Sequence, residues 1–291
     1  MLNSASPLMS VIIPHYNDLD HLRHCLESLR RQTLPRERYE VIVADNNSVG
    51  GVQAVEQIAG DIIVVPAPDQ GAGPARNAGV AAARGRVLAF IDSDCLADQN
   101  WLREGIKALE RSDYVGGQVI TKIGGPQKMS PAEAVEAVFA FNFKRYIEKE
   151  GFSGSGNLFV PKEIFGCVGG FRAGVSEDID WCRRANALGY QLGYAEEAIV
   201  FHSARREWQE LKRKWDRILG ETISLARERS GWRLRWTVYA VVVGASPLAH
   251  WITVVRSPRL IGLRSKCCGL LGLVRIRSYR SYRMLHLLLS P

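Results

Sequence analysis

The feature that most constrains the fold is an alternation of short apolar runs and helical patterns along the first third of the chain. The apolar runs, which we read as buried strands, cover residues 8–14, 39–44, 61–65 and 87–91. Between them apolar residues recur at helical spacing, as from Leu19 to Leu29. Such alternation is typical of a mostly parallel sheet with helices on both faces. We therefore predict a Rossmann-like α/β fold.

Polar residues follow three of these predicted strands. The clusters are Tyr16-Asn17, Asp45 to Asn47 and Asp92 to Asp94. The carboxyl ends of parallel strands meet at one edge of a sheet, where open α/β folds bind their ligands. Paired carboxylates there suit a hard divalent cation that bridges to phosphate oxygens. A solvated surface loop is the alternative for an isolated Asp-x-Asp. The Gly-x-Gly-x-x-Gly fingerprint does not follow the first strand, which argues against a dehydrogenase.

The positive charge of the chain is concentrated at its C-terminal end. Residues 206–291 contain 17 Lys and Arg against 5 Asp and Glu, whereas residues 1–205 contain 21 against 25. This distribution argues against nucleic-acid binding by the whole protein and favours a basic appendage on a slightly acidic domain. We expect domains at 1–205 and 206–291. The six cysteines lack zinc-site spacing, so we expect reduced thiols.

Four short motifs occur in a fixed order in the first half of the chain. They are Val11-Ile12-Ile13-Pro14-His15-Tyr16-Asn17, Asp45-Asn46-Asn47-Ser48, Gly73-Pro74-Ala75-Arg76-Asn77-Ala78-Gly79 and Asp92-Ser93-Asp94. Together they resemble the motifs of the family 2 glycosyltransferases. That family consists of inverting sugar transferases with the GT-A fold, so the resemblance implies a GT-A-type sheet and a nucleotide-sugar donor.

Motifs in the second half agree with this resemblance. They are Gly154-Ser155-Gly156-Asn157-Leu158-Phe159-Val160, Gly169-Gly170-Phe171-Arg172 and Ser176-Glu177-Asp178-Ile179-Asp180-Trp181-Cys182-Arg183-Arg184. The last contains the family's Glu-Asp-x-Asp signature at a helix start. The run from Ala198 to His202 resembles the family's late strand, which ends in histidine. The resemblance covers residues 8 to 205.

The resemblance implies a metal site formed by Asp94 and His202. Asp92 is expected to hold the ribose, or the metal through water. Mg²⁺ or Mn²⁺ fits this oxygen-rich set and would neutralise charge on the leaving diphosphate. A structural role for the histidine is the alternative.

The nucleotide sugar is expected at the strand ends and at the start of the helix after the third strand. The predicted contacts are Pro14, Tyr16, Asn17, Asp45, Asn47, Arg76, Asn77, Asp92 and Ser93. Near a helix start, backbone N–H groups and the helix dipole favour an anion, which suits Arg76 and Asn77 as neighbours of base or phosphate. Ordinary packing of Tyr16 and a solvated Arg76 are the alternatives. A UDP-sugar is the first donor expected.

The acidic helix start is expected to deprotonate the acceptor hydroxyl. We assign the base to Asp178, with Glu177 as second choice and Asp180 as an orienting or capping residue. One-step attack opposite the leaving group inverts the anomeric centre. Further contacts to donor or acceptor sugar are predicted for Gly156, Asn157, Asp180 and Trp181. A single helix is predicted over 131–148, whose aromatic residues either line the acceptor site or pack in the core.

The C-terminal segment has the pattern of a membrane-associated tail. Trp208 to Ile223 reads as an amphipathic basic helix. Trp236 to Val255 is twenty residues without a formal charge, long enough to span a membrane. A re-entrant or surface-lying hairpin fits equally well, and so does a soluble helical subdomain. Basic residues among the apolar ones at the end suit anionic lipids.

The resemblance, together with the tail, implies a metal-dependent inverting glycosyltransferase of the hexosyltransferase type. We expect it at the cytoplasmic face of the cell membrane, with a lipid-linked or glycan acceptor, in cell-surface polysaccharide or glycolipid synthesis. Two alternatives remain open. A sugar-phosphate nucleotidyltransferase requires a Gly-rich basic loop after the first strand. At that place this chain has His15-Tyr16-Asn17 instead. A catalytically silent, sugar-nucleotide-binding membrane scaffold would not need Asp94, Asp178 and His202.

Overall fold

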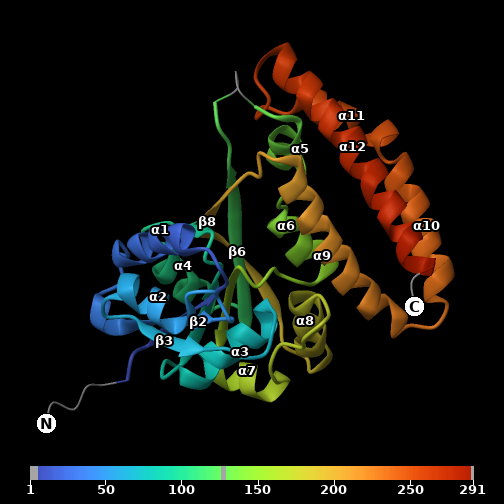
Figure 1. The fold of residues 1–291 in the computed structure, drawn as a ribbon. Coiled ribbons are helices and arrows are strands. Elements are labelled where there is room, and N and C mark those ends of the chain that lie inside the picture. Colours follow the sequence, from blue (N-terminus) through green and yellow to red (C-terminus); the bar gives the residue numbers. More distant parts are fainter. Residues whose placement is uncertain (1–5, 126–128, 290–291) are drawn as a thin grey trace, which may run out of the picture. The chain divides into compact units, whose positions relative to one another are not determined.

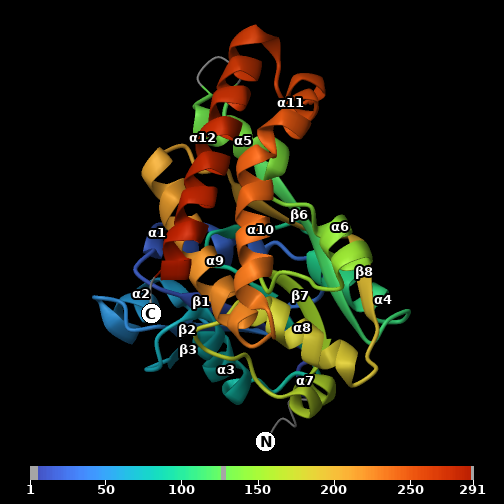
Figure 2. The same cartoon turned by 90° about the vertical axis from the view of Figure 1, so that its right-hand side faces the viewer.

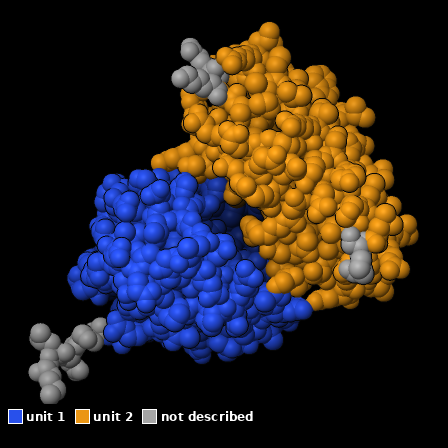
Figure 3. Space-filling view, viewed as in Figure 1, with its two compact units in different colours: residues 1–120, 142–173, 177–202 blue, residues 121–141, 174–176, 203–291 orange. Residues whose placement is uncertain are grey.

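The computed structural model describes residues 6–125 and 129–289, which divide into two compact units (Figure 3). Unit 1 comprises Met1–Ile120, Asn142–Ala173 and Glu177–His202, and unit 2 comprises Thr121–Phe141, Gly174–Ser176 and Ser203–Pro291. The predicted division into 1–205 and 206–291 therefore differs from the units, because residues 121–141 cluster with the C-terminal segment. As a statement about domains it stays a prediction, and its ends (1–5 and 290–291) lie outside the described residues.

A sheet of eight strands in the order β3-β2-β1-β4-β7-β6-β8-β5 runs through unit 1 (Figure 1). The strands are β1 (Met9–His15), β2 (Tyr39–Asp45), β3 (Ile63–Pro66), β4 (Val87–Ile91), β5 (Cys95–Ala97), β6 (Tyr114–Lys122), β7 (Asn157–Pro161) and β8 (Leu192–Ser203). β1 pairs in parallel with β2 and β4, and β2 pairs in parallel with β3. β7 is antiparallel to β4 and β6, and β5 is antiparallel to β8. The predicted mostly parallel α/β sheet is thus confirmed for the first four predicted strands, and antiparallel strands extend it.

Helices connect the strands of unit 1, and those that begin at Leu19, Gly51, Ala72 and Glu177 were predicted from the sequence, whereas those at Trp101 and Lys162 were not. They are α1 (Leu19–Arg30), α2 (Gly51–Ala59), α3 (Ala72–Ala82), α4 (Trp101–Ala108), α7 (Lys162–Val168) and α8 (Glu177–Ala187). α3 packs against β1 and β2, and α7 packs against β7. The Asp18 side chain caps α1 by accepting the His21 N–H (3.3 Å), as expected for a helix start. Gly189, with a φ of 93°, reverses the chain after α8, a conformation that glycine adopts at low cost.

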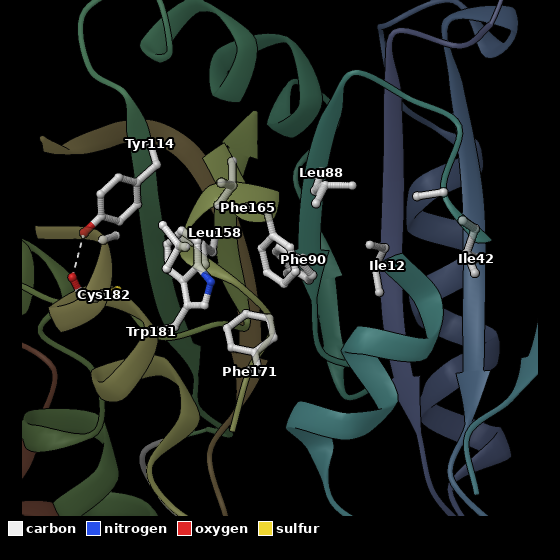
Figure 4. Packing of buried hydrophobic residues seen from close by; sticks show 14 residues of the cluster. Ile12, Ile42, Leu88, Phe90, Tyr114, Leu158, Phe165, Phe171, Trp181 and Cys182 are labelled. Carbon is white, nitrogen blue, oxygen red and sulfur yellow. Dashed lines mark hydrogen bonds between the residues drawn. The ribbon is translucent and has the colours of Figure 1, made fainter. Parts of the chain in front are cut away.

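The core of unit 1 fixes the position of α8 against the sheet (Figure 4). Phe90 of β4 packs edge-on against Phe171 with 5.4 Å between ring centroids. Phe165 stacks on Trp181 of α8 at 5.6 Å. Trp181 is fully buried, and its indole N–H donates to the carbonyl of Gly169 (2.9 Å). Because this ring is anchored, the acidic first turn of α8 has a fixed place in unit 1.

Unit 2 is helical. Its helices are α5 (Pro131–Phe139), α9 (Trp208–Arg227), α10 (Trp232–Ala245), α11 (Pro247–Arg256) and α12 (Gly262–Leu289). The long helix α12 packs along α5, α9, α10 and α11 (Figures 1 and 2). α9 buries Leu211, Leu219 and Ile223, which confirms the predicted amphipathic helix.

The prediction of one helix over 131–148 is wrong. α5 ends at Phe139, and after Asn142 the chain forms a single turn, α6 (Phe143–Arg145), and a five-residue π-helix, Tyr146–Glu150. The Asn142 side chain accepts the Arg145 N–H (3.1 Å) and so starts a new helical segment rather than continuing the old one. The break also separates the two units, because α5 belongs to unit 2 and α6 to unit 1.

The apolar run Trp236–Val255 forms parts of two helices. Pro247 is the first residue of α11, where a proline is tolerated at a helix start but cannot continue α10. Within the described residues, no single helix has the length and apolar character needed to cross a membrane. α10 and α11 together meet that length and composition, with a bend of 45° between them.

Candidate functional site

Two carboxylates lie in the turn after β4. The turn is closed by the Cys95 N–H, which donates to the carbonyl of Asp92 (3.1 Å), and β5 then pairs with β8. In the pairing of β5 with β8, Cys95 lies opposite His202, and this register places the His202 imidazole beside the turn. His202 Nε2 and Asp94 Oδ2 are 3.1 Å apart. The structure thus brings together the two residues predicted as metal ligands, which lie more than one hundred positions apart in the sequence.

The chemistry of this cluster fits a hard divalent cation. Ligand atoms of Asp92, Asp94 and Cys95 lie within 4.8 Å of one another. The Asp92 and Asp94 side chains are 39% and 37% exposed, so both carboxylates can be reached from solvent. Cys95 is buried, and burial, followed by Asp94 and Asp92, raises its pKa well above the ordinary value, which keeps it a thiol. Carboxylate oxygens and an imidazole are ligands that Mn²⁺ accepts, and carboxylates suit Mg²⁺.

Arg76 joins the aspartate turn to the start of α8. Its guanidinium donates to Asp92 Oδ1 (2.5 Å) and to Glu177 Oε1 (2.8 Å), while the residue is 3% exposed. Its buried Nε atom has no hydrogen-bond partner among the described residues. Burial alone would lower the pKa of Arg76, but the negative charges of Asp92 and Glu177 raise it by a larger amount. The pKa therefore lies above its ordinary value. The alternative of a solvated Arg76 is wrong, whereas its contact with base or phosphate stays a prediction.

The glycine turn at 153–157 separates Asp92 from Asp178. A Cβ atom on Gly156 would overlap Asp92 Oδ2, and one on Gly154 would lie 3.7 Å from Asp178 Oδ2. Asp178 is half-buried, and its Oδ1 accepts the N–H of Ile179 (2.7 Å). Glu177 is more buried and already paired with Arg76. Of the two predicted bases, Asp178 is therefore the more accessible.

We expect Gly156→Ala to reduce sugar transfer strongly, because the added methyl group needs the space that Asp92 Oδ2 occupies. This overlap must displace the carboxylate, and a displacement of about 1 Å in an active site can cost about a hundredfold in rate. Turnover of nucleotide sugar by the purified variant is the measurement. Gly166→Ala is the matched control, since apart from its chain neighbours and the backbone of its own helix no atom lies within 4 Å of the position that its new methyl group would take. Equal turnover by the two variants would contradict the prediction.

His15 and Asp45 form a buried pair at the ends of β1 and β2. His15 Nδ1 lies 2.9 Å from Asp45 Oδ1, and His15 Nε2 accepts the Asp18 N–H (3.1 Å). This arrangement places the ring proton on Nδ1, donating to Asp45. Asp45 also accepts the Ser48 N–H (3.2 Å). His15 was not among the predicted site residues, although it stands inside the first motif.

Asparagines shape the loops around this pair. Asn17, with a φ of 52°, accepts the Val49 N–H (2.8 Å), and Asn47, with a φ of 61°, donates to the carbonyl of Pro68 (2.8 Å). Asn46, which the sequence motif contained but the predicted site omitted, donates to the carbonyls of Ala67 and Asp69. It thereby ties the end of β2 to the segment that leads into α3. Tyr16 is 56% exposed, so ordinary core packing does not account for it.

Several predicted contacts belong to the scaffold. Asn157 is fully buried and bonded to Trp101, Gln118 and Ala198, and Trp181 is fully buried in the core. Neither side chain reaches the surface, so only the backbone at these positions could meet a sugar, and the sugar contacts assigned to Asn157 and Trp181 stay predictions. Asp180 binds Arg172 and Arg184, both at 2.9 Å, in agreement with an orienting role.

Three further residues that were predicted to contact the nucleotide also lie in unit 1. The Asn77 amide pairs with both backbone groups of Phe171 and braces α3. Ser93 is half-buried in the turn between the two aspartates, and Pro14 is half-buried in β1 opposite Ala44. The nucleotide contacts assigned to these residues stay predictions.

A Rossmann-like sheet with a metal-fitting aspartate turn at a strand end and an acidic helix start beside it defines the GT-A class of glycosyltransferases, which take their sugar from a nucleotide sugar. The sequence profile described as "Glycosyl transferase family 2" matches residues 10–180. The chain belongs to this family and is a glycosyltransferase.

Curated relatives agree with this assignment. The chain is 32% identical over 223 residues to glycosyltransferase AglE of Haloferax volcanii, covering 74% of this chain and 73% of that protein. It is 26% identical over 286 residues to the pre-mycofactocin glycosyltransferase of Mycobacterium tuberculosis, covering 89% of this chain and 58% of that one.

Solved structures show the same fold. The mannosyltransferase PcManGT of Pyrobaculum calidifontis, in complex with GDP-Man and Mn²⁺, superposes with a TM-score of 0.60 at 16% identity, covering 97% of this chain and 86% of that chain. TarS 1-349 of S. aureus in complex with UDP-GlcNAc superposes with a TM-score of 0.52 at 17% identity, covering 94% and 89%.

Proposed function

We propose that the protein is a metal-dependent, inverting glycosyltransferase that moves a hexose from a nucleotide diphosphate sugar to an acceptor hydroxyl. The observation that carries this proposal is the contact of 3.1 Å between Asp94 and His202 in the turn that also contains Asp92. It supplies what transfer from a nucleotide sugar requires, which is a site for positive charge beside the diphosphate.

We assign metal binding to residues on one side of the glycine turn and proton transfer to a residue on the other side. On one side, Asp94 and His202 would hold Mg²⁺ or Mn²⁺, which when bound neutralises charge on the leaving diphosphate. On the other side, Asp178 accepts the proton of the attacking hydroxyl. Arg76 keeps Asp92 and Glu177 in place between them. Attack from the side of Asp178, opposite the leaving group, inverts the anomeric centre.

A UDP-sugar is the donor that we propose first. The relatives with solved structures carry GDP-Man in one case and UDP-GlcNAc in the other, so the fold accommodates both kinds of base. For this chain, Tyr16 offers an exposed ring at the end of β1 on which a base can stack.

We further propose that unit 2 attaches the enzyme to the cytoplasmic face of the cell membrane, where it acts on a lipid-linked or glycan acceptor for surface polysaccharide or glycolipid. Large apolar side chains are exposed on the C-terminal helices. They include Leu234, Val238, Val241, Val242, Leu248, Trp251, Leu263, Leu271 and Val274. No acidic residue follows Glu228 in the sequence. An apolar surface with basic neighbours is typical of an interface with anionic lipid.

The test is nucleotide release from UDP-, GDP- and dTDP-sugars with Mn²⁺ and a membrane extract as acceptor source. We expect one donor to be turned over, and Asp94→Asn to lower its turnover by about a hundredfold or more, as is usual when a metal-site carboxylate is removed. Chelation of the metal should have a similar effect that added Mn²⁺ reverses.

Asp61→Asn, which changes a carboxylate whose side chain is 66% exposed just before β3, is the matched control and should leave turnover unchanged. Turnover of no donor, or an Asp94→Asn enzyme within about tenfold of wild type, would reject the site assignment.

A further inference from the structure

Unit 2 contains a pocket of about 390 Å³ that the transferase site does not use. It lies between the C-terminal end of α5 and the C-terminal end of α11. Ala140 and Phe141 line one side, and Thr253, Arg256, Ser257 and Arg259 line the other. The pocket therefore combines apolar walls with cationic and hydroxyl groups.

The pocket has an excess of positive charge. Within the described chain, the exposed side chain of Arg256 forms no hydrogen bond or ion pair. The guanidinium of Arg259 donates to the backbone carbonyls of Ala137 and Thr121, which are neutral acceptors. The carboxylate on the wall, Glu136, is already bound by Lys214 (2.6 Å) and Arg205 (3.3 Å). An anionic group entering the pocket would thus meet arginine charges that no carboxylate neutralises.

The surface beside the pocket is apolar. Leu248, Trp251 and Ile252 of α11 are 84%, 50% and 41% exposed, and Ile252 directly precedes the pocket residue Thr253. A ligand whose anionic group lies between the two arginines could place an attached hydrocarbon chain over this face of α11. A free inorganic anion would not contact these apolar side chains. A lipid with a phosphate headgroup would contact both the arginines of the pocket and the apolar face of α11.

We propose that this pocket binds the phosphate group of an anionic membrane lipid, whose hydrocarbon chain runs along the exposed face of α11. Arg256 offers a planar fork that matches phosphate oxygens, and the hydroxyls of Thr253 and Ser257 add further donors. The pocket gives the proposed membrane attachment a specific headgroup contact in addition to general attraction between basic helices and acidic lipid. The proposal rests on that attachment.

The experiment compares substitutions that keep the charge. The full-length protein is bound to phosphatidylcholine vesicles that contain a minor share of phosphatidylglycerol, without donor or metal. Arg256→Lys keeps the positive charge but loses the fork, so we expect it to weaken binding by about tenfold. Thr253→Val removes one hydroxyl and should weaken binding by about threefold. Arg264→Lys on α12, exposed and outside the pocket, is the matched control and should bind like wild type.

The other arms identify what is recognised. Vesicles of phosphatidylcholine alone, which carry no net charge, should bind the wild-type protein and Arg256→Lys weakly and equally, so that the loss in Arg256→Lys depends on phosphatidylglycerol. Inorganic phosphate should compete only weakly. Strong competition by inorganic phosphate, or equal affinity of Arg256→Lys and Arg264→Lys for the phosphatidylglycerol vesicles, would overturn the lipid-phosphate site.

The outcome is independent of the catalytic proposal. Vesicle binding needs neither nucleotide sugar nor metal, so it can fail while nucleotide release is normal, and the reverse also holds. If the wild-type protein binds no vesicle, membrane attachment fails and the pocket proposal fails with it. If it binds vesicles and Arg256→Lys binds equally well, the pocket proposal alone is rejected.

Discussion

Asp178→Asn is expected to lower sugar transfer by at least about a hundredfold while leaving donor binding intact, because removal of a general base costs about that much in rate. The asparagine has the same shape, and its side-chain oxygen can still accept the Ile179 N–H that Asp178 accepts now (2.7 Å). The fold of α8 should therefore be retained. Turnover of the donor with saturating acceptor extract and calorimetric titration with the nucleotide sugar measure the two quantities separately.

Glu177→Gln is the informative comparison for this experiment. Glu177 is bound to Arg76 and is the more buried of the two residues, so the substitution should act on donor positioning and stability rather than on proton transfer. The opposite result is that Glu177→Gln loses turnover by about a hundredfold while Asp178→Asn stays near wild-type activity. That result would identify Glu177, and not Asp178, as the base.

Arg76→Met is expected to lower the free energy of unfolding by about 3–5 kcal/mol, the usual cost of removing one partner of a buried ion pair. Methionine replaces the length of the side chain but leaves the Glu177 carboxylate, whose side chain is 11% exposed, without its partner. The contribution of Asp92 is smaller, because its side chain is 39% exposed and solvent compensates for the loss. Denaturant unfolding of both proteins at neutral pH is the measurement.

Arg36→Met is the control for this stability effect. Arg36 pairs with Asp61 at 2.6 Å, but the side chains are 44% and 66% exposed, and exposed pairs contribute at most about 1 kcal/mol. Similar losses for the two variants would show that burial does not matter at Arg76. The Arg76→Met protein should also lose sugar transfer, since the position of Asp92 depends on the guanidinium.

The sequence predicted those parts of the fold in which local pattern decides the structure. Strands β1 to β4 and the helices between them follow the alternation of apolar runs and helical spacing, because the central strands are buried on both faces and each helix buries one face. The proximity of Asp94 and His202 was implied by the family resemblance. It depends on the β5–β8 register, which pairs residues more than one hundred positions apart and which no local pattern shows.

Burial of individual polar and aromatic residues was less predictable. Asn157 and Trp181 stand in motifs of the family, but the motif does not show that one closes a buried hydrogen-bond network and the other fills the core. Arg76 presented the reverse case. A helix-start arginine gives no local sign of burial, and its partners Asp92 and Glu177 lie 16 and 101 residues further along the chain.

The origin of α5 in the middle of the chain has a consequence for how such proteins diversify. Val135 and Ala137 of α5 are buried in one cluster with Leu211, Val254 and Leu273, so the C-terminal helices pack around α5. If only the residues after 205 were replaced by those of another protein, α5 would pack against helices whose side chains differ from its present neighbours. Exchange of the C-terminal helices between such proteins would require that α5 be exchanged with them.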